Sequence, residues 1–445
     1  MIFDEKYFMY KNMTADSSMI SPPDKTLKPA RDKGSLTAKG RATRAAILDA
    51  AHEVFKKKGF FGASISEIVR SCGVSMATFY QYFKNKEQAF QELNDRIISR
   101  FMEQTDAISM EGLTFKQRLM CNIEILYDHT QNNLAFNRIL GESELIDQVT
   151  NAYYESIARH LRLFLRHEVQ LGNIRSLDPN IVAYGLIGIC YFHSLDWKTP
   201  QHDLPRDQLL NLIADFMMNG ISGSAPWKRG ADWHLLSIPD PVALRQENEE
   251  QLTKGKKTRL AIFNAAEEVI GEYGFNRASI SEITRAAKVA QGTFYVHFES
   301  KFDLIKGFVT YFNRMMRRNV QRVVARTTDR RDAERVGILA FIDFTRLHRK
   351  IYRIIPECEV ISRDVSIWYY SKIARGYFKG LKQGIKRGEI RDLPVELLAH
   401  TIMGMVHFIV LKWIIWNTSP QSDISDQLRT DILEFLFFGL KPEQK

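Results

Sequence analysis

Residues Ser64–Lys86 read SISEIVRSCGVSMATFYQYFKNK, and Ser279–Lys301 repeat the pattern as SISEITRAAKVAQGTFYVHFESK. Each copy opens with Ser-Ile-Ser-Glu, a capping box in which the first serine accepts from a backbone N–H and the glutamate reaches back, so a helix is predicted to begin there. A tight turn is predicted at Cys72–Val74 and at Ala287–Val289, and a helix of two turns follows it. The stretch therefore predicts a helix-turn-helix twice in one chain.

The second helix of each copy has the features that a DNA major groove requires. Phe79 and Phe83 stand four residues apart and share a buried face, as do Phe294 and Phe298, which leaves small and hydroxylated residues elsewhere. A slim helix brings its N-terminal turn to base edges while flanking hydroxyls and cations hold phosphates. The residues expected at base edges or groove walls are Ser75, Met76, Ala77, Thr78, Tyr82, Ala290, Gln291, Gly292, Thr293 and His297. Those expected on phosphates are Ser64, Tyr80, Lys86, Ser279, Tyr295 and Lys301.

Positive charge is concentrated around the two copies. The net charge is +10, and residues 39–100 and 254–314 carry +5 and +4 of it (11 Lys/Arg against 6 Asp/Glu, and 10 against 6), as expected for binding to a polyanion. Basic residues before each copy suit flanking phosphates or a minor-groove arm, and a solvated charge run is the alternative. They are Lys39, Arg41, Arg44, Lys254, Lys256, Lys257 and Arg259.

Thr-Phe-Tyr, the aromatic pair and the lysine before a further helix resemble the DNA-binding head of the tetracycline-repressor (TetR) family. The resemblance implies an all-α fold, with a three-helix head and a helical effector and dimerisation domain in each unit. It also implies that two C-terminal helices of each unit pair with those of a second unit, and this role falls on residues 181–197, 206–220, 395–416 and 422–440. Because both units belong to one chain, we expect an intramolecular pseudo-dimer, alone or in a higher homo-oligomer.

The duplication covers whole units of the chain. Without gaps, 25 of the 48 positions from Lys39 to Lys86 are identical 215 residues later, and later motifs such as Tyr153-Tyr154 and Tyr369-Tyr370 also recur. We expect a flexible tail (1–38), head 1 (39–98), effector and dimerisation domain 1 (99–220), a linker (221–251), head 2 (252–313) and effector and dimerisation domain 2 (314–445). The first helix of each head is predicted at 43–58 and 258–273.

The composition points to a cytoplasmic protein. Four scattered cysteines form no metal-ligand or disulfide pattern, and the N-terminus lacks the continuous apolar run of a signal peptide. The longest apolar run, 402–416, is interrupted by His407 and Lys412 and is predicted to be a buried helix rather than a membrane span. His400 and His407 lie two turns apart without a third ligand nearby in sequence, so neither metal nor cofactor is expected.

The middle segment of each unit mixes apolar helices with aromatic and polar residues, as an effector cavity does, although an ordinary helical core predicts much the same. Family position alone suggests as effector contacts Tyr127, Phe136, Glu142, Tyr154, Phe344, Tyr352, Glu357 and Tyr370. The family expectation for the effector is an apolar small molecule with a fatty or aromatic body.

The sequence therefore favours a one-component transcriptional regulator, usually a repressor in this family, that a small molecule releases from operator DNA. An effector-independent architectural DNA-binding protein is the alternative. An enzyme is not expected, because no phosphate loop, nucleophile motif, metal triad or partnered carboxylate pair is present.

Overall fold

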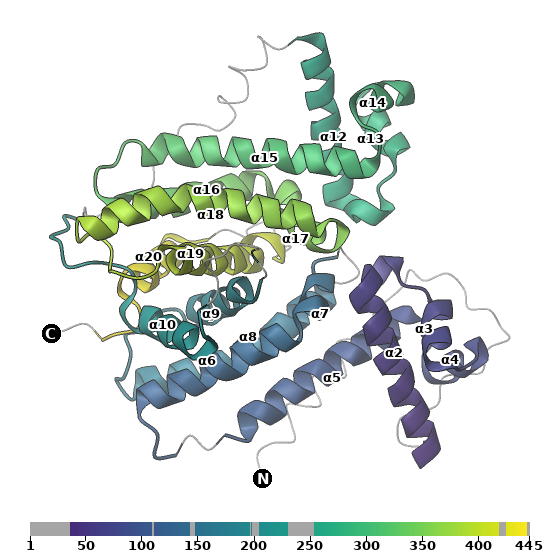
Figure 1. Ribbon diagram of the computed structural model, residues 1–445, viewed down its shortest axis with the longest axis horizontal. Helices are drawn as coiled ribbons and strands as arrows, with labels where there is room; N and C mark the ends of the chain where they lie inside the picture. Colours follow the sequence, from purple (N-terminus) through teal and green to yellow (C-terminus); the bar gives the residue numbers. More distant parts are fainter. Residues whose placement is uncertain are drawn as a thin grey trace. The chain divides into compact units, whose positions relative to one another are not determined.

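The computed structural model describes residues 36–108, 111–142, 147–195, 197, 204–229, 253–417 and 424–442. By its internal contacts the chain divides into two compact parts, residues 1–51 with 64–90 and residues 52–63 with 91–445. Within the described ranges the secondary structure is helical, with one isolated antiparallel bridge between Ser222 and Ile390 and no strand (Figure 1). The prediction of an all-α fold with two tandem units is confirmed.

The first helix of each head is longer than predicted and is broken near its end. Helix α2 spans Ala38–Gly62, and α12 spans Lys254–Arg277. Each contains a glycine with a left-handed backbone, Gly59 (φ 72°) and Gly274 (φ 75°), where the helix changes direction. A residue with a Cβ is strained in this region of φ, so the repeated Gly-Phe pair marks a repeated break.

The two heads continue with the same short helices. In the first they are α3 (Ile65–Cys72), α4 (Met76–Tyr82) and the long α5 (Lys86–Asp106), and in the second α13 (Ile280–Ala286), α14 (Gln291–His297) and α15 (Lys301–Val324). Both predicted capping boxes are present: Ser64 and Ser279 each accept from the backbone N–H of the glutamate three residues on, whose carboxylate accepts in return.

Each half then adds a further set of helices, most of them longer than the short helices of the heads. In the first half (residues 39–220) these are α6 (Phe115–Asn132), α7 (Leu134–Ile139), α8 (Asp147–Gln170), α9 (Pro179–Ser194) and α10 (Arg206–Asn219). In the second half (252–445) they are α16 (Arg330–Leu347), α17 (Arg349–Ile361), α18 (Arg363–Lys386), α19 (Val395–Val410), the π-helical turn η2 (Leu411–Ile415) and α20 (Asp426–Phe438).

The halves meet where α9 crosses α19, and α10 and α20 lie beside this crossing (Figure 1). Gly188 and Gly404 stand at the crossing, and a Cβ on either would overlap the backbone carbonyl of the other. Trp197 stacks on His400 with ring centroids 4.0 Å apart, and the ring of Trp413 lies 6.0 Å from that of Tyr184. The four helices expected to come together thus pack within one chain.

The stretch Val395–Ile415 is long and apolar enough to cross a membrane, but 83% of its most apolar window is buried against the rest of the protein. It pairs with α9, which is itself buried along its whole length. A core helix of this kind matches the prediction of a buried helix and is weak evidence for a membrane span.

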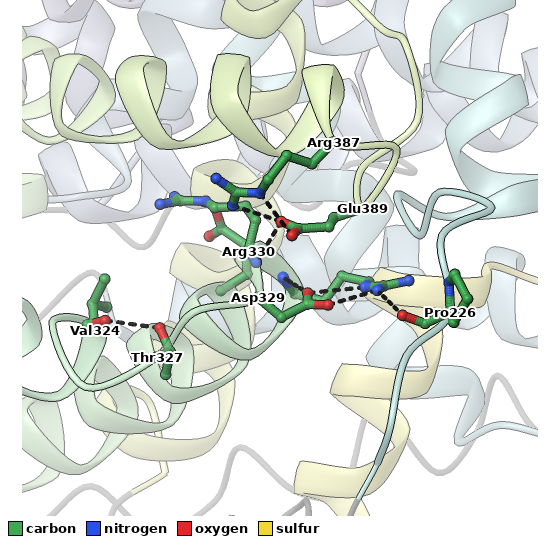
Figure 2. A network of polar contacts seen from close by, with 9 residues as sticks. Pro226, Val324, Thr327, Asp329, Arg330, Arg387 and Glu389 are labelled. Atoms are coloured by element: carbon green, nitrogen blue, oxygen red, sulfur yellow. Dashed lines mark hydrogen bonds and ion pairs between the residues drawn. The ribbon is translucent and has the colours of Figure 1, made fainter.

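The first residues of the predicted linker are docked on the second half. The backbone N–H groups of Gly223 and Ala225 donate to the carbonyls of Glu389 (2.8 Å) and Gly388 (2.9 Å). Buried Arg331 donates to the carbonyls of Ala225 (2.7 Å) and Pro226 (3.0 Å) and to the carboxylate of Asp329, and Figure 2 shows Asp329 and Pro226 at this contact. The predicted linker therefore begins with residues that pack on the second half, where their backbone groups find partners on α16 and after α18. Its remainder from residue 230 lies outside the described residues, as does the predicted tail up to residue 35.

Candidate nucleic-acid interface and cavity

The N-terminal turns of α4 and α14 are exposed, as groove entry requires. Ser75 caps α4 by accepting from the N–H of Thr78 at 3.0 Å, and the two hydroxyls lie 2.8 Å apart. Met76 follows with 42% of its surface exposed. In α14 the capping position is Ala290, whose side chain makes no such bond, and exposed Gln291 and Gly292 follow. The two turns thus offer different chemistry, an apolar thioether and a free amide.

The aromatic residues divide as the i, i+4 pattern predicted. Phe79, Phe83, Phe294 and Phe298 are buried. Tyr80 is half-buried, Tyr295 is 54% exposed, and both remain available to a phosphate backbone. Thr78, Thr293 and His297 are half-buried and Ala77 is exposed.

Tyr82 does not lie where it was expected. The side chain is 8% exposed, and its hydroxyl points to the neighbourhood of Gly40 on α2. The expectation that Tyr82 lines a groove is therefore wrong. A position three residues after buried Phe79 returns to the inner face of a helix, which is why this side chain packs inward.

Arg44 and Arg259 occupy equivalent positions and serve the interior of each head. The guanidinium of Arg44 lies 4.9 Å from the ring centre of Phe83, and that of Arg259 lies 4.5 Å from that of Phe298. Burial lowers the pKa of Arg44. These cation–π contacts hold the first helix of each head to the residue that ends α4 or α14. The expectation that Arg44 and Arg259 contact flanking phosphates or belong to a minor-groove arm is therefore wrong. Lys39, Arg41, Lys254, Lys256 and Lys257 are exposed.

Lys301 is engaged inside the second head. Its ammonium donates to the carbonyls of Phe275 (2.6 Å) and Ala278 (2.8 Å) and lies 4.4 Å from the ring centre of Phe275. Burial lowers the pKa of this lysine, although Glu357 raises it in part. These carbonyls belong to the end of α12, which a cation at a helix C-terminus stabilises. The expected phosphate contact is therefore wrong for Lys301.

Glu142 and Glu357 hold helix ends rather than a ligand. The carboxylate of Glu142 accepts from the N–H groups of Phe60 (2.6 Å) and Phe61 (3.2 Å), directly after the break at Gly59. Glu357 accepts in the same way from Phe275 at 3.0 Å, after the break at Gly274. Each glutamate thus satisfies amides that the break leaves without helical partners, and the expectation of an effector contact is wrong for both.

Three of the remaining candidates belong to the hydrophobic core. Phe136 is fully buried against Tyr153 and His52, Phe344 packs against Phe312, and Tyr127 is buried on α6. The expected effector role is wrong for these packing positions. Tyr154 is also buried and stacks on Trp416, but it borders a small cavity of about 40 Å³ between the halves.

Tyr352 and Tyr370 line a larger cavity of about 140 Å³ in the second half. Its walls come from α15, α16, α17, α18 and α19, with Phe192 contributed by α9. The hydroxyl of Tyr352 lies 2.5 Å from Nδ1 of His407, whose pKa burial lowers to about 3, so that this imidazole is neutral. Tyr370 donates to the buried carboxylate of Glu359 at 2.8 Å.

Most residues that line the cavity were not predicted, among them Tyr369, Gly337 and Gly376. Arg317 and Gln321 also border the cavity and are partly or fully exposed to solvent. The cavity is therefore an apolar space with a few polar groups and an open side, the form typical of a small-molecule site.

Comparisons with known proteins match both heads to one family. A family model described as bacterial regulatory proteins, tetR family, matches residues 47–93 and 262–307. The fatty acid metabolism regulator protein of Bacillus subtilis is 27% identical over 191 residues, which cover 41% of this chain and 94% of the relative. The uncharacterised transcriptional regulator YhgD of the same bacterium is 19% identical over 183 residues, 40% of this chain and 96% of the relative.

Among solved structures, FadR from Bacillus subtilis in complex with stearoyl-CoA is similar, at 22% identity and a TM-score of 0.35. The match covers 39% of this chain and 96% of that chain. The two curated relatives are thus matched along nearly their whole length by about two fifths of this chain.

Proposed function

Because the chain belongs to the TetR family of bacterial transcriptional regulators, in a tandem form with two DNA-binding heads, we propose that it binds its operator as an intramolecular pseudo-dimer. We propose further that it is a cytoplasmic repressor and that a small molecule in the helical domain releases it from DNA. We also propose the domain boundaries that the sequence predicts, with the tail, head 1, domain 1, the linker and head 2 ending at residues 38, 98, 220, 251 and 313. The described residues hold no group of side chains that could bind a metal ion.

One observation carries the DNA-binding proposal: the chain has two recognition helices, α4 and α14, whose first turns are exposed, and the first helix of each head begins with exposed lysines. The residues that we propose to contact DNA are those predicted from the sequence, without Tyr82, Arg44, Arg259 and Lys301. The packing of α9 against α19 within one chain supports the pseudo-dimer, which is expected to set the recognition helices about 34–36 Å apart, one turn of DNA.

Two observations support the proposal that a small-molecule effector binds the helical domain. The second half contains the cavity lined by Tyr352 and Tyr370, and a relative of similar length to one half is a fatty acid metabolism regulator. We propose that the effector is mainly apolar, with a fatty or aromatic body.

The function is tested by selecting bound sequences from random duplex DNA, with and without cell extract as a source of effector. The proposal expects a defined operator whose recovery falls when extract is added. Recovery of a defined operator that extract does not change, at any dose, would favour the effector-independent architectural protein. Recovery of no preferred sequence would contradict operator recognition.

Exposed lysines at the start of α2 and α12 are expected to contact phosphates. Replacing both Lys39 and Lys254 with alanine should lower the slope of log affinity against log salt concentration by about 2, roughly one for each lost phosphate contact. The control is Lys379→Ala, an exposed lysine on α18, which should leave the slope unchanged. DNA binding with the wild-type slope in the double variant would disprove these contacts.

The operator is expected to be an imperfect palindrome, because Met76 and Gln291 hold equivalent places. A glutamine amide can pair with adenine, which discriminates against a wrong base by about 1–3 kcal/mol, whereas methionine offers apolar contact. Met76→Gln should therefore shift the selected operator toward symmetry and leave the other half-site unchanged. If the natural protein selects a perfect palindrome, the two residues do not read bases.

A further inference from the structure

The duplication allows the same helix pair to be compared in the two halves. Helices α6 and α8 of the first half correspond to α16 and α18 of the second, at shifts of 215 and 216 residues. In the first half three pairs of side chains join the helices. They are the stacked rings of Phe115 and Phe164, the ion pair of Arg118 with Glu168 at 2.7 Å, and the hydrogen bond of Asn122 with His160 at 3.0 Å.

In the second half the same positions have lost these side chains. Phe164, Glu168 and His160 are replaced on α18 by Gly380, Gly384 and Gly376, and Asn122 is replaced on α16 by Gly337. Nothing lies within 4 Å of a Cβ added to Gly376, and a Cβ on Gly337 would meet only ordinary contacts. Both glycines line the 140 Å³ cavity. The space that the Asn122–His160 pair fills in one half is therefore open in the other.

A fourth difference leaves a buried hydroxyl without a partner. In the first half, Tyr153 bonds to Nε2 of His129 at 2.8 Å. In the second half the tyrosine is kept as Tyr369, but Phe344 replaces the histidine. Tyr369 is 1% exposed, lines the cavity, and its hydroxyl finds no hydrogen-bond partner among the described residues. Buried hydroxyls are normally paired, so an unpaired one at a cavity wall points to a ligand that supplies the partner.

We propose that the chain binds one small molecule, in the second half alone, where the ligand fills the space between Gly337 and Gly376 and pairs with the hydroxyl of Tyr369. This inference rests on the proposed effector function and assigns it to one half. The cavity is close to the roughly 150 Å³ that holds a benzene ring, so the buried part of the ligand is an aromatic ring or a short branched chain with one hydrogen-bonding oxygen. Arg317 lines the cavity and is partly exposed to solvent, so its guanidinium suits an anionic outer end of the ligand.

In this proposal the first half has a structural role. Its three side-chain contacts between α6 and α8 hold this helix pair together without a ligand, as the ion pair of Arg118 with buried Glu168 illustrates. The two duplicated halves thus differ in role: the second half binds the small molecule, and the first half is packed without one.

The test uses the full chain and fluorine NMR with 4-fluorobenzyl alcohol as the probe. Binding to the natural chain should broaden the fluorine signal of the probe. Introducing the first-half pair into the second half, as the graft Gly337→Asn with Gly376→His, should abolish this broadening. The matched control removes the pair from the first half, as Asn122→Gly with His160→Gly, and should keep the broadening. Urea unfolding of both variants establishes that they fold. Broadening that survives in the folded graft, or that is lost in the control, would overturn the assignment.

A second variant tests the hydroxyl and does not depend on the graft. Tyr369→Phe should weaken 4-fluorobenzyl alcohol about three- to tenfold, the range expected for one hydrogen bond, and leave 4-fluorotoluene unchanged. If Tyr369→Phe changes the affinity for both probes equally, or for neither, the probe does not form a hydrogen bond with the hydroxyl of Tyr369.

Operator binding in the same variants separates this inference from the proposed function. Operator binding is first measured without probe in each variant, because a variant that binds the operator still has folded DNA-binding heads. If the probe binds as expected but operator affinity never responds to it, the site stands and the effector role fails. If operator binding is intact and the graft binds probe like the natural chain, the regulator stands and the assignment to the second half fails.

Discussion

Replacing Gly188 or Gly404 with alanine is expected to lower the free energy of unfolding by about 3 kcal/mol or more. A Cβ on either residue would overlap the backbone carbonyl of the other, so the helices α9 and α19 would have to move apart. Overpacking in a core costs about 1–3 kcal/mol and sometimes more, and here backbone rather than a flexible side chain must shift. This exceeds the roughly 1 kcal/mol by which alanine is the better helix former. Urea unfolding of the full chain measures the difference.

The control for this substitution is Gly376→Ala on α18. It makes the same chemical change inside a helix, but nothing lies within 4 Å of the added Cβ. Its stability should equal that of the natural chain or exceed it by up to about 1 kcal/mol. Equal stability of the Gly188 and Gly376 variants would mean that the crossing is looser than the structure has it.

Arg331→Met is expected to cost about 3–5 kcal/mol, the usual penalty for breaking a buried ion pair by removing one partner. The side chain is 1% exposed, donates to the carbonyls of Ala225 and Pro226, pairs with Asp329 at 2.6 Å, and lies 5.0 Å from the ring centre of Trp227. Methionine fills the volume but leaves the two carbonyls without their donor and leaves the carboxylate of Asp329 with only the backbone N–H of residue 331. Urea unfolding measures the loss, and Lys116→Met is the control, because Lys116 holds the equivalent place in the first half and is exposed.

The same variant should change the response to pH. Burial tends to raise the pKa of Asp329, but hydrogen bonds from the side chain and backbone of Arg331 outweigh it and hold this pKa below its ordinary value. A carboxyl with a lowered pKa stabilises the fold at pH values above its ordinary pKa, and this contribution is lost as the pH falls through the lowered value. The penalty for Arg331→Met should therefore shrink in acid. A penalty that is the same at neutral and acid pH would show that the ion pair contributes little.

The sequence predicts the heads well because their signals are local. Capping boxes at Ser64 and Ser279 and phenylalanines at i, i+4 act within one or two turns, and the structure has them as expected. The direction of a long side chain depends instead on neighbours that are distant in sequence. Lys301 therefore turned out to bind carbonyls at the end of α12, and Glu357 to bind the N–H of Phe275 after the break in that helix.

The cavity could have been found from the sequence by a different comparison. Aligning the halves with each other shows that His160, Phe164 and Glu168 become glycines at four-residue spacing on one face of α18. Arg330 fills the space beside Gly380 and Gly384, so among these three glycines only Gly376 borders open space. The unpaired hydroxyl of Tyr369 could not be found in this way, because the loss of its partner involves α6 and α8 in one half and α16 and α18 in the other. Pairings between helices become visible only when their packing is known.

The crossing of α9 with α19 also sets the order in which the chain can mature during synthesis. Helix α9 is buried along its whole length, yet its partner begins about 200 residues later, after Pro394. At the usual rate of about 5–20 residues per second, the ribosome needs about 10–40 s to make that partner. Although α6 and α8 already cover part of this helix, the side that faces α19 stays without its partner throughout this interval. We therefore expect chaperone binding at Pro179–Ser194 until the last helices emerge.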